Sequence, residues 1–72
     1  MEVVVNGQMR DVPEGTTVSG LLEHLKIAPE RVVVELNLTV LKRAQCPATR
    51  LKDGDHVEIV QFVGGGAWPR TL

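Results

Sequence analysis

The sequence predicts an α+β fold in which a mixed sheet of four to five short strands packs on one helix. Short runs of β-branched residues alternate with turn residues, and a single stretch has the apolar spacing of a helix. A chain of 72 residues, 43% hydrophobic and 24% charged, can bury one core. We therefore expect one domain over residues 1–63 and a flexible tail over residues 64–72.

The first element is a β-hairpin. Apolar side chains alternate over Met1–Val5, and Asn6-Gly7 is the strongest short signal for a hairpin turn. A second short strand follows over Gln8–Val12.

A helix comes next. Pro13-Glu14-Gly15 breaks the strand, and Thr17 is suited to cap a helix over Val18–Lys26. Its apolar residues follow the spacing of one buried face: Val18, Leu21, Leu22 and Leu25. Gly20 costs about 1 kcal/mol relative to Ala inside a helix, so we expect it to pack closely against the sheet.

The middle of the chain predicts two strands and a crossover. Ala28-Pro29-Glu30 ends the helix, and the β-branched run Arg31–Leu36 forms the third strand. Asn37-Leu38 turns the chain into a short strand over Thr39–Leu41. The crossover Lys42–Leu51 is irregular, with one helical turn near Ala44.

The last strand lies over Val57–Val63, after a turn whose Gly54 suits a positive φ angle. Since the first and last strands are the longest and most apolar, we expect them to pair in the sheet centre. The helix then covers one face of the sheet. The strand residues that should point at it are Val3, Val5, Val32, Val34, Leu36, Val57 and Ile59.

Strict alternation places four apolar side chains on the opposite, open face: Val4, Val33, Val60 and Phe62. They would lie beside Glu2, Glu35 and Glu58. The preference of β-branched residues for strands explains such residues without any function. An apolar patch with a charged rim is also typical of a protein interface, and its position beside Gly64–Gly66 favours docking.

Three glycines, Gly64-Gly65-Gly66, leave the last strand. Glycine permits nearly any backbone angle and the closest approach of another surface. This run could therefore thread into a narrow active site and offer a backbone carboxylate to an enzyme. The alternative is an ordinary flexible linker.

Several classes of function are disfavoured. A net charge of −1 with scattered basic residues gives no attraction for nucleic acid or an anionic membrane. One cysteine, Cys46, and the absence of a signal-peptide pattern indicate the cytoplasm, and we expect Cys46 to be a packing residue. His24 and His56 lack partners at metal-ligand spacing, so no metal site is expected. Asp53 and Asp55 flank a glycine and should cap the turn.

The chain resembles the ThiS family of thiamine-biosynthesis sulfur carriers, which have the ubiquitin-like β-grasp fold. The resemblance covers Met1–Gly66 and rests on the element order, on the turn Leu51–Asp55 and on the ending Phe62-Val63-Gly64-Gly65-Gly66. Thr17-Val18 also matches the family's helix start. The related small subunit of molybdopterin synthase (MoaD) typically has a proline before its glycine pair.

The resemblance implies that the carboxylate of Gly66 is adenylated with ATP by an E1-like, ThiF-like activating enzyme and converted to a thiocarboxylate. A ThiG-like thiazole synthase would then receive the sulfur. The carrier would be a protein co-substrate that is not an enzyme and binds no cofactor. Gly64, Gly65 and Gly66 would enter the partner's active site, while the open-face patch Val4, Val33, Val60 and Phe62 holds the domain on it.

The chain departs from this pattern in the extension Ala67–Leu72, which places the free carboxylate on Leu72. We expect a processing protease to cut after Gly66, since exposed chain ends are preferred cleavage sites. The extension could instead regulate the carrier by hiding its terminus. A sulfur carrier for molybdopterin or cysteine synthesis, a ubiquitin-like protein modifier and a non-covalent β-grasp binding module stay open as alternatives.

Overall fold

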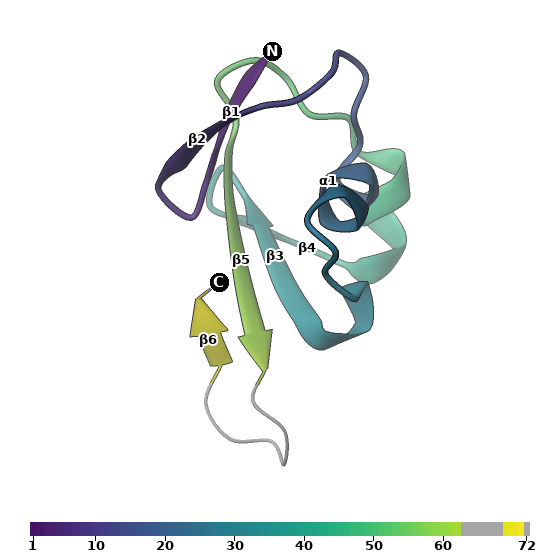
Figure 1. Ribbon diagram of the computed structural model, residues 1–72. Coiled ribbons are helices and arrows are strands. Elements are labelled where there is room, and N and C mark those ends of the chain that lie inside the picture. The colour runs from purple at the N-terminus through teal and green to yellow at the C-terminus, as the bar shows by residue number, and fades with distance from the viewer. Residues whose placement is uncertain (63–68, 72) are drawn as a thin grey trace.

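The computed structural model describes residues 1–62 and 69–71, which form a mixed sheet with one α-helix and two 3-10 helices on one face (Figure 1). In chain order the elements are β1 (Glu2–Val5), β2 (Gln8–Asp11), α1 (Val18–His24), η1 (Pro29–Arg31), β3 (Val32–Leu36), β4 (Thr39–Leu41), η2 (Arg43–Ala48), β5 (His56–Phe62) and β6 (Pro69–Thr71). The strand order is β2-β1-β5-β3-β4, and β6 pairs with β5. The predicted α+β class is confirmed.

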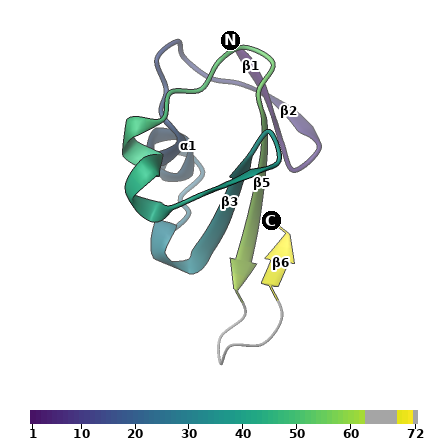
Figure 2. The same cartoon turned by 180° about the vertical axis from the view of Figure 1, so that it is seen from behind.

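Strand β5 lies at the centre of the sheet. It runs parallel to β1, where Val4 is opposite His56 and Val5 is opposite Val57. It runs antiparallel to β3 along most of its length (Figure 2). The prediction that the first and last long strands pair in the sheet centre is therefore confirmed.

Two hairpin turns begin with asparagine. Asn6 and Gly7 connect β1 to β2 with φ angles of 49° and 80°, and Asn37 and Leu38 connect β3 to β4 with φ angles of 50° and 71°. Two positive φ angles match the type I′ turn, whose twist fits that of the flanking strands. Leucine is an unusual residue for this conformation, and Leu38 is 90% exposed.

Helix α1 has well-defined ends. The Oγ1 of the N-cap residue Thr17 accepts a hydrogen bond from the backbone N–H of Gly20 at 3.0 Å. At the other end Lys26 takes a φ of 60°, and the N–H of Ile27 donates to the carbonyl of Leu22 at 2.9 Å. This is a Schellman motif. It ends α1 at His24, two residues before the predicted end at Lys26.

The predicted contact of Gly20 with the sheet is wrong. A Cβ placed on Gly20 would meet the Oγ1 of Thr17 at 3.3 Å and the Cγ2 of Thr16 at 3.5 Å. Gly20 therefore makes room for the side chains that begin its own helix.

The core lies between the sheet and the layer formed by α1 and η2 (Figure 1). Its buried members are Val3, Val5, Val12, Val18, Leu21, Leu22, Val34, Cys46, Leu51, Val57 and Ile59. Three residues expected to be fully inside, Leu25, Val32 and Leu36, are partly buried against this cluster. Each fully buried aliphatic side chain contributes about 1.5–3 kcal/mol of transfer free energy. Within the described residues, no helix has the length and apolar character that crossing a membrane requires.

The extension differs from the expected flexible tail. Residues Pro69–Thr71 form β6 and pair antiparallel with the end of β5. Proline is tolerated in an edge strand, which explains how Pro69 can begin this one. Residues 63–68 and 72, which include the predicted boundary at residue 63, lie outside the described residues.

Candidate functional site

The open face of the sheet carries an apolar pair beside the end of β5. Val33 in β3 lies directly opposite Val60 in β5, and cross-strand partners project from the same face. Both side chains are partly exposed. The structure thus brings these two members of the predicted patch together.

Val4 lies elsewhere on this face. Its cross-strand partners are Met9 in β2 and His56 in β5, so it sits four residues along β5 from Val60. Met9 is 65% exposed. The predicted patch is therefore divided into two apolar areas, one around Val33 and Val60 and one around Val4 and Met9. Nothing in the described residues places the side chain of Phe62, whose backbone pairs with Pro69.

The side chain of Asn6 binds the edge of β5 just beyond the last residue of β1. The backbone N–H of Ile59 donates to Oδ1 of Asn6 at 2.7 Å, and Nδ2 of Asn6 donates to the carbonyl of Ile59 at 3.2 Å. Sequence reasoning identified the turn at Asn6 but missed this cap. The available signal was an asparagine, with its donor and acceptor, at the end of a strand.

Strand β6 occupies the next stretch of the same edge. Its register sets Val60 opposite Thr71, Gln61 opposite Arg70 and Phe62 opposite Pro69. Along the chain, the edge of β5 that faces β1 is therefore bound first by β1, then by the side chain of Asn6 and then by β6. Figure 2 shows β1 and β6 beside β5.

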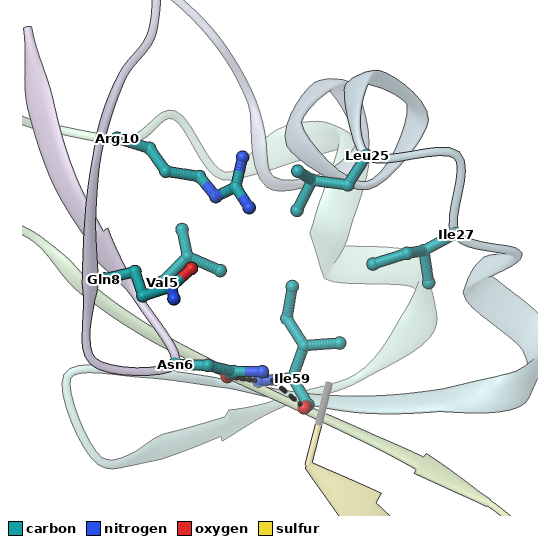
Figure 3. A pocket seen from close by; sticks show the side chains of 7 residues that line it. All are labelled: Val5, Asn6, Gln8, Arg10, Leu25, Ile27 and Ile59. Carbon is teal, nitrogen blue, oxygen red and sulfur yellow. Dashed lines mark hydrogen bonds between the residues drawn. The ribbon is translucent and has the colours of Figure 1, made fainter.

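A pocket of about 270 Å³ opens beside this edge, on the face that α1 covers (Figure 3). Its walls are apolar, with polar side chains from the β1–β2 hairpin at one side. The residues that line it are Val5, Asn6, Gln8, Arg10, Leu25, Ile27 and Ile59. Figure 3 shows the guanidinium of Arg10 reaching over the space from β2. Sequence reasoning did not predict this pocket, because it depends on how far the hairpin stands from the end of α1.

Gly64, Gly65 and Gly66 follow β5 after a single residue but lie outside the described residues. Their entry into a partner's active site stays a prediction. What the structure gives is the position of their attachment: the central strand of the sheet ends at Phe62, beside the Val33 and Val60 pair.

The acidic turn before β5 is structural, as predicted. Oδ2 of Asp55 accepts a hydrogen bond from the N–H of Lys52 at 2.7 Å, and Oδ1 of Asp53 accepts one from the N–H of Glu2 at 2.7 Å. Gly54 has a φ of 85°. These contacts tie the start of β1 to the turn that leads into β5.

The two histidines and the cysteine are the remaining candidates for chemistry. His24 and His56 are both exposed, and no group of three metal-ligating side chains occurs within residues 1–62 and 69–71. Cys46 is 4% exposed in η2, and burial raises the pKa of its thiol. Both features fit the packing role that the sequence predicted.

Comparison with known families gives a match over residues 3–66 to the family described as the ThiS family. A crystal structure of the thiamine biosynthesis protein ThiS from Geobacter metallireducens is similar over 92% of this chain and all of that chain, with a TM-score of 0.79 and 48% sequence identity.

Two relatives differ greatly in length. The protein named sulfur carrier protein ThiS from Thermus thermophilus is 36% identical over 64 residues, which cover 89% of this chain and 98% of that protein. A protein named thiazole synthase from Magnetococcus marinus is 42% identical over 69 residues, which cover 96% of this chain but 21% of that protein. This chain thus spans about a fifth of the length of that relative.

Proposed function

We propose a function from one premise: this chain belongs to the ThiS family. On this proposal it is a sulfur carrier protein for thiamine biosynthesis, and its reactive group is the backbone carboxylate of Gly66. The observation that carries the proposal is the extent of the family match. It includes all of β5, continues through the three glycines and stops at Gly66.

The proposed chemistry needs two steps at one carbon atom. A carboxylate resists nucleophiles because of its negative charge, so a carboxylate oxygen of Gly66 first attacks the α-phosphorus of ATP. This forms an acyl adenylate and releases pyrophosphate. Sulfide then adds to the acyl carbon, AMP leaves with the electron pair of the broken C–O bond, and a thiocarboxylate is formed. The carrier contributes position, and the catalytic groups belong to the activating enzyme.

We propose two protein partners and a reducing, cytoplasmic location. An E1-like activating enzyme would form the adenylate, and a thiazole synthase would take the sulfur. The second partner is supported by the relative from Magnetococcus marinus, in which a domain similar to this chain is part of a protein named thiazole synthase. Joining a domain to an enzyme in one chain raises the effective concentration of the domain at that enzyme.

The apolar pair Val33 and Val60 is the proposed docking face for these partners. It lies on the open side of the sheet and next to the end of β5, so a protein bound there is close to the start of the glycine run. Phe62 extends the same face in the sequence pattern, and Val4 with Met9 would contact the outer part of the interface.

Residues 67–72 lie beyond the family match, and we propose that a protease removes them. A side chain on any residue of the glycine run Gly64–Gly66 would make that segment wider, whereas glycine adds no bulk to the backbone. Cleavage after Gly66 would turn an internal peptide bond into the carboxylate that the chemistry requires.

The test is an intact-mass measurement on two chains, the full chain and a chain that ends at Gly66. Each is incubated with the purified activating enzyme, ATP and sodium sulfide. We expect the shorter chain to gain the mass of one oxygen-to-sulfur exchange and the full chain to stay unchanged. Thiocarboxylate on the full chain without loss of six residues would refute trimming, and no thiocarboxylate on either chain would refute the carrier function.

A matched pair of variants separates the thread from the fold. Gly65→Val in the shorter chain should abolish the mass gain. Gly15→Val lies in an exposed turn outside β5, at a φ of 84° that strains valine, so it should lower stability but leave the mass gain intact in any folded sample. Lysine-linked conjugates that survive reductant would instead identify a protein modifier. Full function of the Gly65→Val variant in cells would identify a non-covalent binding module.

A further inference from the structure

Strand β6 covers a part of the β1-facing edge of β5 that β1 does not reach. Strand β1 pairs with β5 only around His56 and Val57, and the backbone of Ile59 is bound by the side chain of Asn6. From Gln61 onward the same edge would be unpaired without β6. An unpaired edge in the middle of a sheet is a template for another strand.

The direction of the backbone groups of β5 shows which residue of β6 is hydrogen-bonded to it. The carbonyl of Val57 accepts a hydrogen bond from the backbone N–H of Asn6, and the N–H of Ile59 donates to Oδ1 of Asn6. Alternate residues of β5 therefore turn their backbone groups toward this edge. Gln61 continues that alternation, and its partner in β6 is Arg70. Proline cannot donate a hydrogen bond, and Pro69 and Thr71 occupy the two positions whose backbone N–H points away from β5.

The pocket next to Ile59 defines what a docked strand would present. A strand that pairs with Gln61 cannot continue along β5, because Asn6 already holds the backbone of Ile59. Asn6 and Ile59 also line the pocket, so the next residues of such a strand would leave the sheet beside it, near the guanidinium of Arg10 (Figure 3). An apolar side chain followed by a carboxylate would suit these surroundings.

We propose that the edge of β5 at Gln61 and this pocket together form a docking surface for an extended segment of the activating enzyme, and that β6 blocks it in the untrimmed chain. The occupant would add antiparallel to β5, place an apolar side chain in the pocket and set an acidic residue beside Arg10. Trimming after Gly66 would then have a second effect, since it removes β6 and opens the surface. This inference rests on the proposed function for the identity of the partner.

Backbone hydrogen exchange tests the covering strand without any partner. We expect exchange of the Gln61 amide to accelerate about tenfold or more when the chain ends at Gly66, because its acceptor is lost. The amide of Val60, which faces β3, should keep its protection in both chains. Equal exchange at Gln61 in both chains would overturn the proposal and would leave the sulfur-carrier function untouched.

Two proline variants of the full chain test the block itself. Arg70→Pro removes the N–H that faces Gln61, whereas Thr71→Pro removes one that faces away, and Arg70→Ala controls for the lost charge. We expect only Arg70→Pro to raise the affinity of the full chain for the purified activating enzyme, about tenfold and toward that of the chain ending at Gly66. Equal affinities for Arg70→Pro and Thr71→Pro would refute the block.

The pocket has its own test in the chain that ends at Gly66. Arg10→Glu should weaken binding of the activating enzyme about tenfold, while Arg31→Glu, which reverses an exposed charge away from this pocket, should not. Neither change should alter exchange of the Gln61 amide. Equal binding by both variants would remove the pocket from the docking surface.

Discussion

The side chain of Asn6 takes the place of a strand beside Ile59. Its amide accepts from the backbone N–H of Ile59 at 2.7 Å and donates to the carbonyl of the same residue at 3.2 Å. On the opposite edge of β5, Oδ1 of Asn37 accepts from the N–H of His56 at 2.9 Å. Two turn asparagines with φ near 50° thus hold β5 from its two sides.

Replacing each asparagine by glycine separates the cap from the turn, since glycine keeps the positive φ and loses the side chain. Asn6→Gly should lower the free energy of unfolding by about 1–2 kcal/mol, because two partly buried backbone groups lose their partner. Asn37→Gly should cost less than half of this, because its hydrogen bonds are exposed. Urea unfolding measures both, and equal losses would contradict the cap.

Leu38 is a position where glycine should stabilise the protein. A left-handed backbone costs a residue with a Cβ about 1–2 kcal/mol, and Leu38 has a φ of 71° while 90% exposed. Leu38→Gly should raise the free energy of unfolding by about 0.5 kcal/mol after the greater freedom of glycine in the unfolded chain is subtracted. Leu38→Ala is the control and should give no such gain. A loss with Leu38→Gly would show that the Leu38 side chain contributes to folding.

Val60 tests the open face as a docking site. Val60→Lys places a positive charge on the apolar pair. The neighbouring side chains Glu58 and Glu35 are negative, so the new lysine meets no like charge from them. We expect its affinity for the activating enzyme to fall about tenfold or more, by titration calorimetry. Leu38→Lys, in the turn between β3 and β4 and 90% exposed, should bind normally. Unchanged binding by a folded Val60→Lys variant would exclude this face.

Cys46 should make stability depend on alkaline pH. Burial raises the pKa of its thiol above the ordinary value of 9.0, so the folded state holds the proton more tightly than the unfolded state. The contribution of the protonated thiol to the free energy of unfolding is complete below the pKa of Cys46 in the unfolded chain. It is lost as the pH rises through the pKa of Cys46 in the folded protein. The free energy of unfolding of the unaltered protein should therefore decline above pH 9.0 more steeply than that of Cys46→Ala. Parallel pH profiles would contradict the shift.

The sequence was sufficient for the elements whose signals are local. Asn6-Gly7 predicts its hairpin because both residues tolerate a positive φ, and Thr17 predicts the start of α1 because its hydroxyl can accept from the helix N-terminus. The pairing of β1 with β5 followed from their apolar character. The ThiS family was identified from the turn before β5 and the glycines after it.

Features that depend on register were not available from the sequence. Alternation assigns Val4 and Val60 to one face but does not say how far β1 reaches along β5, so the division of the patch was missed. Strand β6 was missed because Pro69 argues against a strand unless its missing donor points away from the partner. The end of α1 was misplaced by two residues because Lys26 takes a backbone conformation that glycine usually fills.

The central place of β5 bears on how the protein is made. Both neighbouring strands, β1 and β3, are synthesised well before β5, which begins at His56. They cannot be joined into one sheet until β5 is available, so the sheet is completed only when nearly the whole domain has left the ribosome. A nascent chain that stalls earlier exposes the apolar sides of two unjoined hairpins and is a substrate for chaperones and proteases. Quality control would therefore act on the chain until the strand that carries the glycines has been made.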